Sequence, residues 1–156
     1  MIPQPSHGSP NFHPLATLPM QLVWEGKYDE YGQRREVDGV GCGVSIEAVY
    51  DRLGITPLQL MEFCQKWQIA ELAVFGSILR DDFRDDGHDR SDIDGLFKYL
   101  PHTNMSLLRR ARMKIEMEEL CQRPVDLVLL TEVINSHNLN RKKCILESAR
   151  LIYVKG

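Results

Sequence analysis

The sequence lacks several features that mark common classes of protein. None of its apolar runs approaches the ~18 residues of a membrane-spanning helix. Its first residues have neither the charged region nor the continuous apolar region of a secretory signal. The net charge of −3 argues against bulk affinity for nucleic acid, which usually needs a basic face. We therefore expect a protein that neither enters a membrane nor binds nucleic acid directly.

The cysteines also lack the spacing of a metal or redox site. None of the four forms a CxxC pair, which argues against a zinc centre. Cys64, Cys121 and Cys144 fall in helical patterns, so we expect them to be reduced core residues. Reduced cysteines suit a cytoplasmic protein. The 156 residues, of which 43% are apolar, are enough for one globular domain with its own core.

Composition divides the chain near residue 44. Residues 1–19 hold five of the eight prolines, and such a segment builds neither helix nor sheet. Residues 20–37 allow a hairpin, because apolar and polar residues alternate and glycines mark turns. The glycines of residues 39–43 indicate a linker, since no strand–helix unit surrounds them. We expect residues 1–44 to form a partly disordered extension outside a domain of residues 45–156.

Helical and strand patterns alternate through the predicted domain. The helices are expected at residues 45–53, 57–68, 78–83, 103–122 and 138–149, and the strands at 71–75, 92–99 and 125–130. The chain then closes on a short apolar run, residues 151–154. The second helix is the best marked, because Thr56, Pro57 and Gln59 form the pattern of a capping box. The alternation predicts an α/β or α+β fold, with a small mixed sheet of about three to four strands flanked by helices.

The helix expected at residues 103–122 carries two apolar stripes. One stripe comprises Leu107, Leu108, Ala111 and Ile115, and the other comprises Met113, Met117, Leu120 and Cys121. Such a helix packs either on its own sheet and on a partner, or with both stripes buried in one chain. The sequence leaves these two arrangements open.

The residues that carry chemistry lie between Leu72 and Leu100. Gly76 and Ser77 open a short helix, whose free backbone N–H groups suit a phosphate. Asp92 and Asp94 are two residues apart on a strand, so their side chains share one face. Asp126 joins them if its own strand is adjacent.

Three neighbouring carboxylates need a counterion. Two charges about 4 Å apart repel by roughly 4 kcal/mol at an effective dielectric constant near 20. Mg²⁺ removes this repulsion, and it favours one or two carboxylates together with phosphate oxygens. Two such ions permit in-line attack at phosphorus. We expect Asp92 and Asp94 to be ligands, and Asp126 to be the third ligand or the group that orients or deprotonates the attacking hydroxyl.

Each of these features alone has a simpler explanation. A pair of aspartates on a strand is more often an exposed polar face, and a Gly-Ser turn more often a plain helix cap. Nearby residues are expected to have structural or solvent-facing roles. Phe63 and Trp67 are expected in the core, and His88 in a solvated loop. A solvated acidic face is expected to comprise Asp81, Asp82, Asp85 and Asp86. The combination, in this order and spacing, is much more specific than its members.

The combination resembles the nucleotidyltransferase superfamily with the DNA polymerase β-type palm. Within it, the chain is similar to the minimal nucleotidyltransferases (MNT proteins). Gly76-Ser77, fourteen intervening residues, Asp92-x-Asp94 and Asp126 match the motif, and Arg80 matches a frequent family arginine. The resemblance covers roughly residues 45–154.

The resemblance implies an activity and a partner. MNT proteins are commonly antitoxins paired with HEPN ribonuclease toxins, and they transfer AMP from ATP to a toxin tyrosine with Mg²⁺ as cofactor. It implies that Gly76 and Ser77 hold the triphosphate, Arg80 neutralises phosphate charge, and the three aspartates hold metal. It also implies a hetero-oligomer. The alternatives are an antitoxin that neutralises its toxin by binding alone, and a nucleotidyltransferase acting on a small molecule.

Two departures from the family pattern lie near the motif. The spacer is longer than usual, and the excess lies around residues 87–90. Gly95 stands at a strand position where the family usually has an apolar residue. Glycine weakens a strand by up to about 1 kcal/mol, so Gly95 predicts a less efficient site.

Overall fold

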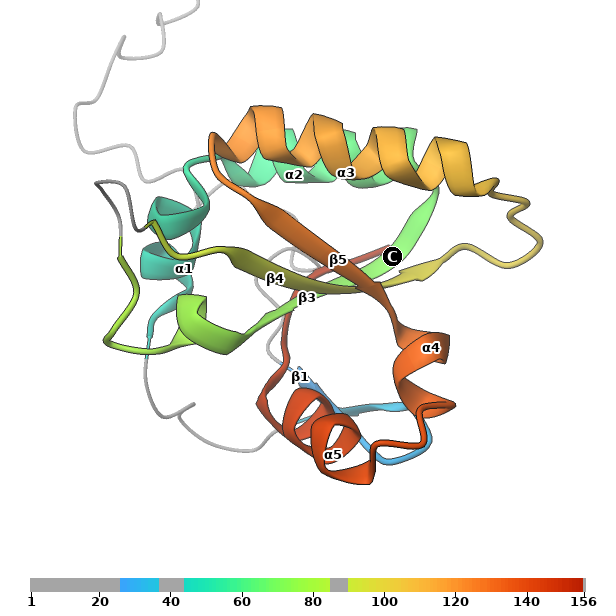
Figure 1. Ribbon diagram of the computed structural model, residues 1–156. Helices are drawn as coiled ribbons and strands as arrows, with labels where there is room; N and C mark the ends of the chain where they lie inside the picture. Colours follow the sequence, from blue (N-terminus) through green and yellow to red (C-terminus); the bar gives the residue numbers. More distant parts are fainter. Residues whose placement is uncertain (1–25, 37–43, 85–89, 156) are drawn as a thin grey trace, which may run out of the picture.

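A four-stranded mixed sheet forms the centre of the computed structural model, which describes residues 26–36, 44–84 and 90–155 (Figure 1). Its strands are β3 (Ile69–Phe75), β4 (Ile93–Tyr99), β5 (Val125–Leu129) and β6 (Arg150–Val154), in the order β5-β4-β3-β6. β3 is antiparallel to both β4 and β6, and β4 is parallel to β5. The predicted α/β class with a small mixed sheet is confirmed.

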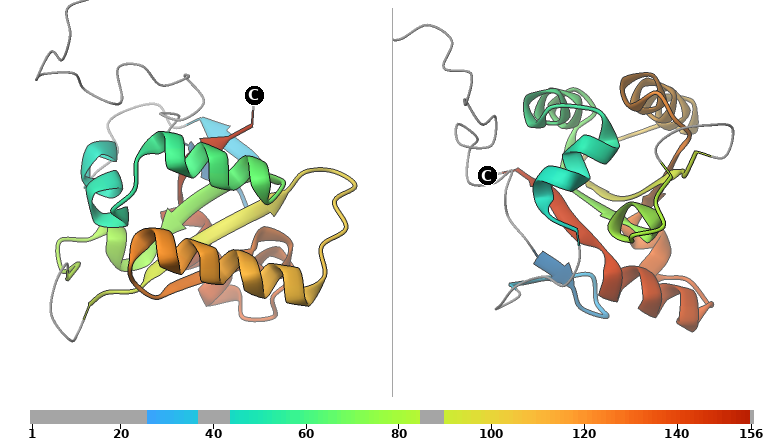
Figure 2. Two further views of the ribbon diagram at one scale, coloured as in Figure 1. Left: turned by 90° about the horizontal axis from the view of Figure 1, so that it is seen from above. Right: turned by 90° about the vertical axis from the view of Figure 1, so that its left-hand side faces the viewer.

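Helices cover both faces of this sheet. They are α1 (Ile46–Leu53), α2 (Pro57–Lys66), α3 (Leu107–Cys121), α4 (Leu130–Ile134) and α5 (Leu139–Ser148), with a short 3₁₀ turn, η3 (Gly76–Leu79). α2 and α3 lie side by side over one face, whereas α4 and α5 lie below the other (Figures 1 and 2). None of the helices in the described parts of the chain is long and apolar enough to span a membrane.

The two sheet faces bury separate cores because strand residues alternate. Ile93 and Phe97 of β4 belong to the core beneath α1, α2 and α3. Leu96 belongs to the second core, which includes residues of α4 and α5. Asp94 is two residues before Leu96, so it lies on the face of the second core.

The capping signals predicted the starts of the helices well. Thr56 Oγ1 accepts from Gln59 N at 3.1 Å, and Gln59 Oε1 accepts from Thr56 N at 2.8 Å, which completes the capping box. The longest helix begins later than expected, at Leu107, because the Ser106 hydroxyl caps it. α4 was not predicted, since five residues are too few for a periodic pattern.

The two stripes of α3 face different environments. Met113, Met117 and Cys121 are buried. Leu107 and Leu108 are 83% and 65% exposed, and Ile115 is 54% exposed. Of the two arrangements that the sequence left open, burial of both stripes in one chain is therefore wrong.

The predicted hairpin is present, and it packs on the domain. β1 (Gly26–Tyr28) and β2 (Arg34–Glu36) pair antiparallel. Tyr28 is 4% exposed and belongs to the second core together with Leu146 of α5. The boundary expected near residue 44 stays a prediction, although part of the chain before it contacts the domain. The expectations for residues 1–19 and 39–43, and for Asp85, Asp86 and His88, lie outside the described residues.

Two local predictions were wrong. Cys144 is exposed, unlike the buried Cys64 and Cys121, because it faces away from the side of α5 that buries Ile145 and Leu146. The short helix expected at residues 78–83 is the 3₁₀ turn of residues 76–79 instead. Ser77 therefore lies inside the turn and does not cap it. Phe63 and Trp67 are buried, as expected.

Candidate active site

The Gly76–Ser77 turn is built against the carboxylate of Asp94. Gly76 has a φ angle of +78°, a backbone conformation that residues other than glycine rarely adopt. A Cβ atom at this position would lie 2.6 Å from Asp94 Oδ2. Glycine is therefore required twice here, for the backbone conformation and for the close approach of the turn to the carboxylate.

Strand pairing brings Asp126 to the same place. In the parallel pairing of β4 with β5, Asp94 is opposite Asp126. The bond from Ile93 N to Pro124 O, at 3.0 Å, fixes the start of this pairing. Opposite residues of neighbouring strands project to the same face of a sheet. Asp94 is half-buried and Asp126 is exposed.

Asp92 and Ser77 join the turn to the start of β4. Asp92 precedes β4 and is exposed. Ser77 Oγ donates to the Asp92 carbonyl oxygen at 3.4 Å, a long contact. The predicted residues of the turn and of the aspartate motif thus meet at one end of the sheet.

Charges of both signs surround Asp94. Burial raises the pKa of Asp94, the negative charges of Asp126 and Asp92 raise it further, and Arg80 and Arg141 oppose the shift. The pKa of Asp94 thus responds to the other two aspartates and to Arg80, as the motif predicts. Arg80 also pairs with Asp82 at 3.1 Å, but both side chains are well exposed, so this pair contributes little.

Arg141 is the charged residue that sequence reasoning missed. It lies near the start of α5, within an Arg-Lys-Lys run. That run was the only signal for it, and the spacing does not tell which of the three cations acts on Asp94. Only the fold, which places α5 on the same sheet face as Asp94, identifies Arg141.

The donor set fits a hard divalent cation shared with a substrate. Within residues 26–36, 44–84 and 90–155, no three His, Cys, Asp or Glu side chains already form a metal-binding group. Mg²⁺ does not need one, because it is usually held by one or two carboxylates, with phosphate oxygens and water completing its octahedron. Asp92, Asp94 and Asp126 offer only carboxylate oxygens, the donors that Mg²⁺ prefers.

Gly95 is explained by packing between β4 and β5. Its buried position has no room for a side chain, because a Cβ atom would lie 2.7 Å from Leu127 Cδ2. Leu127 is opposite Gly95 in the register and fills this space. The glycine that departs from the family pattern is therefore matched by a neighbouring leucine next to the aspartate pair.

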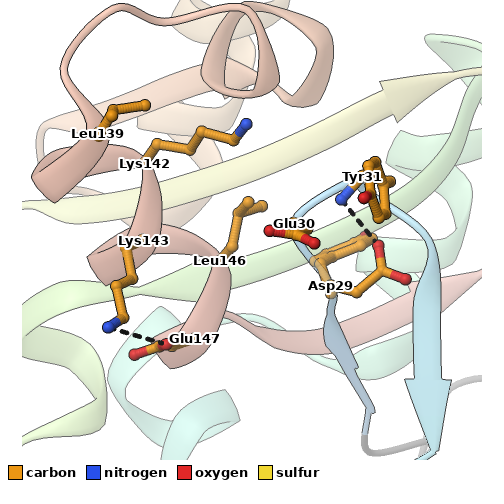
Figure 3. Close-up of a pocket in the computed structure, with 9 residues that line it drawn as sticks. Asp29, Glu30, Tyr31, Leu139, Lys142, Lys143, Leu146 and Glu147 are labelled. Carbon is orange, nitrogen blue, oxygen red and sulfur yellow. Dashed lines mark hydrogen bonds and ion pairs between the residues drawn. The ribbon is translucent and has the colours of Figure 1, made fainter.

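A large hollow lies away from the aspartates. It encloses about 590 Å³ between the hairpin and α5, and Lys142 and Lys143 line one wall while Asp29 and Glu30 line the other (Figure 3). A smaller hollow of about 90 Å³ is lined by Arg141 together with residues of β5 and α4. Neither of these two hollows is lined by the aspartates or by the Gly76–Ser77 turn.

Comparison with known families agrees with this geometry. Residues 59–152 match the family model of the nucleotidyltransferase domain, and the match contains all six predicted site residues. The chain belongs to the nucleotidyltransferase domain family. This membership supports a transferase activity, and it places the aspartates and the Gly76–Ser77 turn within the matched region. No curated protein matches the sequence significantly.

Several solved structures resemble this nucleotidyltransferase domain at low identity. A minimal nucleotidyltransferase is 24% identical over 70% of this chain and 97% of its own, with a TM-score of 0.45. A chain of the toxin–antitoxin MntA–HepT is 12% identical over 63% of this chain and 69% of its own, with a TM-score of 0.42. A chain from a structure of the tri-AMPylated Shewanella oneidensis HEPN toxin in complex with MNT antitoxin is 13% identical over 63% of this chain and 69% of its own, with a TM-score of 0.43.

Substitutions of two glycines distinguish the effect of backbone strain from the effect of a steric clash with Asp94. Gly54 and Gly76 both have φ above +70°, but a Cβ atom at Gly54 would meet only Cys121 O, at 3.7 Å. We expect Gly54→Ala and Gly76→Ala each to lower the free energy of unfolding by about 1 kcal/mol or more. Only Gly76→Ala should weaken MgATP binding, measured by calorimetry. Equal binding by both variants would contradict the role of the Gly76–Asp94 contact.

The raised pKa of Asp94 makes a prediction for stability without metal. Because its pKa is higher in the folded state, ionisation of Asp94 opposes folding, and stability is lost as the pH rises from the unfolded to the folded pKa. In EDTA, Asp94→Asn should therefore melt above wild type at neutral pH, with the gap closing in acid. Asp81→Asn, at an exposed position, is the control. A wild type that melts higher than Asp94→Asn at neutral pH would contradict the electrostatic account.

Proposed function

We propose that this nucleotidyltransferase is an antitoxin that transfers AMP from ATP to a tyrosine of a HEPN ribonuclease toxin. The observation that carries the proposal is the approach of the Gly76–Ser77 turn to Asp94, opposite Asp126. It joins a phosphate-binding turn to a carboxylate pair. The order and spacing of the motif favour the minimal nucleotidyltransferases among the members of the family.

The turn and two cations would hold the nucleotide. Backbone N–H groups and the hydroxyl of Ser77 bind the triphosphate. Arg80 and Arg141, whose charges both lower the pKa of Asp94, would balance phosphate charge. Asp92, Asp94 and Asp126 would hold Mg²⁺, which when bound supplies charge neutralisation at the phosphates.

The reaction exchanges one bond at the α-phosphorus for another. The tyrosine oxygen of the toxin forms a bond to the α-phosphorus, and the bond to the bridging oxygen of the β-phosphate breaks. Pyrophosphate leaves with the electron pair. Asp126 is exposed on β5, an edge strand of the sheet, and would accept the hydroxyl proton.

A second candidate function is neutralisation by binding alone. The exposed stripe of α3 favours it, because Leu107, Leu108 and Ile115 are large apolar side chains in solvent. Contiguous exposed apolar side chains often mark a protein interface. In this function the nucleotide site is idle, and the antitoxin acts by covering its toxin.

Intact mass spectrometry of the partner tests the transfer. The proposed HEPN toxin, incubated with this protein and MgATP, should gain the mass of one or more AMP groups. The double variant Asp92→Asn with Asp94→Asn should add none, because it removes two of the carboxylates expected to hold Mg²⁺. Asp81→Asn, an exposed aspartate beyond the turn, should retain full transfer.

The same variants separate the two candidate functions. If the double variant still binds the toxin but no longer neutralises it, transfer is the function. If it binds and neutralises as well as wild type, binding alone is sufficient and the transferase proposal is wrong. Unchanged AMP addition by the double variant would overturn the assignment of the aspartates.

A further inference from the structure

An arginine of α1 holds the backbone of the phosphate-binding turn. Arg52 is half-buried, and its Nη1 donates to the carbonyl oxygens of Ile78 at 2.8 Å and Arg80 at 2.7 Å. Charge-assisted bonds of this length are stronger than neutral ones. Arg52 thereby fixes the end of η3, which Arg80 directly follows.

A second arginine holds the other part of the same segment. Arg123 lies just before β5 and is 9% exposed. Its Nη1 donates to the carbonyl oxygens of Arg84 and Ser91, both at 3.1 Å. Arg84 and Ser91 also bond to each other, through Arg84 N to Ser91 Oγ at 2.9 Å and Ser91 N to Arg84 O at 3.1 Å. Ser91 directly precedes Asp92.

One aromatic ring connects the two arginines. The guanidinium carbon of Arg52 lies 5.2 Å from the centre of the Phe83 ring, and that of Arg123 lies 4.6 Å from it. Both distances are in the range of cation–π contacts. Phe83 is half-buried, and it packs against the core as well as against the two arginines. Two arginines that are far apart in the sequence thus hold one segment by its carbonyl oxygens and its ring.

We propose that Arg52 and Arg123 are positioning residues of the nucleotide site, which keep the Gly76–Ser77 turn and Asp92 at a fixed separation. The inference rests on the proposed function, because it assigns these arginines a role in the same reaction. Neither is a catalytic residue, since each acts through the backbone of residues 78–91. The role matters because a displacement of about 1 Å at a reacting centre can cost ~10²-fold in rate.

The arrangement also explains how the longer spacer is accommodated. The extra residues of the motif, around 87–90, fall between Arg84 and Ser91. Arg84 and Ser91 are hydrogen-bonded to each other and to Arg123. These bonds hold together the two residues that flank the segment with the extra residues. The β3–β4 pairing, in which Phe75 is opposite Asp94, and the arginine contacts together set the distance from the turn to Asp92, and neither depends on the spacer length.

Hydrogen exchange measured by mass spectrometry tests the positioning role without an activity assay. Arg52→Ala should speed exchange at least about ten-fold in peptides covering residues 76–84 and 90–93, with α2 and β6 unchanged. Arg52→Lys should restore near-wild-type exchange, because both bonds come from a single nitrogen that an ammonium can replace. Arg112→Ala, at an exposed arginine of α3, is the matched control.

Kinetics of AMP transfer complete the test. Arg52→Ala should lower kcat about ten-fold or more and leave KM for ATP within about two-fold, with recovery in Arg52→Lys. A rise in KM alone would make Arg52 a phosphate ligand and overturn the proposal. Unchanged exchange in Arg52→Ala, or exchange in Arg52→Lys as fast as in Arg52→Ala, would also overturn it.

The two proposals fail in distinguishable ways. If wild type transfers no AMP, the proposed function is wrong, and the exchange of Arg52→Ala still decides whether the arginines hold the segment. Arg123 is buried, so Arg123→Ala is expected to destabilise the whole domain. The positioning role is therefore tested by comparing the hydrogen exchange and the kinetics of Arg52→Ala with those of Arg52→Lys.

Discussion

The close approach of Gly76 to the carboxylate of Asp94 is the constraint on which the rest of the site depends. It requires a residue without a side chain at the end of β3, in a backbone conformation that favours glycine. It also requires β3 and β4 to be paired so that Phe75 is opposite Asp94. The antiparallel pairing of these strands therefore sets where a phosphate and a metal can meet.

Placing three aspartates together opposes folding, and the surrounding fold offsets this cost. Asp94 has a raised pKa because it is partly buried beside Asp126 and Asp92. Cations from η3 and α5 counter the negative charge, and cores on both faces of the sheet hold its strands in place. A metal ion or nucleotide that bound only the folded site would stabilise the domain further.

Local signals in the sequence predicted the secondary structure and the motif well. The Thr56–Gln59 capping box and the alternation of side chains between the two faces of the strand in residues 92–99 involve near neighbours in the sequence. The sequence alone therefore reveals them. The three aspartates were predicted to converge because their order and spacing resemble a known family. Only the register of β4 with β5 then places Asp94 opposite Asp126.

The features that sequence reasoning missed all depend on contacts between distant segments. Arg52 reaches residues 26 and 28 positions further on, and Arg123 reaches back 32 and 39 positions. Arg141 acts on Asp94 from another layer of the fold, and Leu127 alone explains why Gly95 has no side chain. No periodicity or short motif reports such contacts, since they arise from topology.

A crystal structure with Mn²⁺ and a non-hydrolysable ATP analogue tests the central claim most directly, because the anomalous signal of Mn²⁺ locates the metal. The account predicts Mn²⁺ at about 2.1 Å from carboxylate oxygens of the aspartate cluster, as for the Mg²⁺ that it replaces. It also predicts the triphosphate on the N–H groups of the Gly76–Ser77 turn. Metal bound away from Asp94, or phosphates that do not contact the turn, would contradict it.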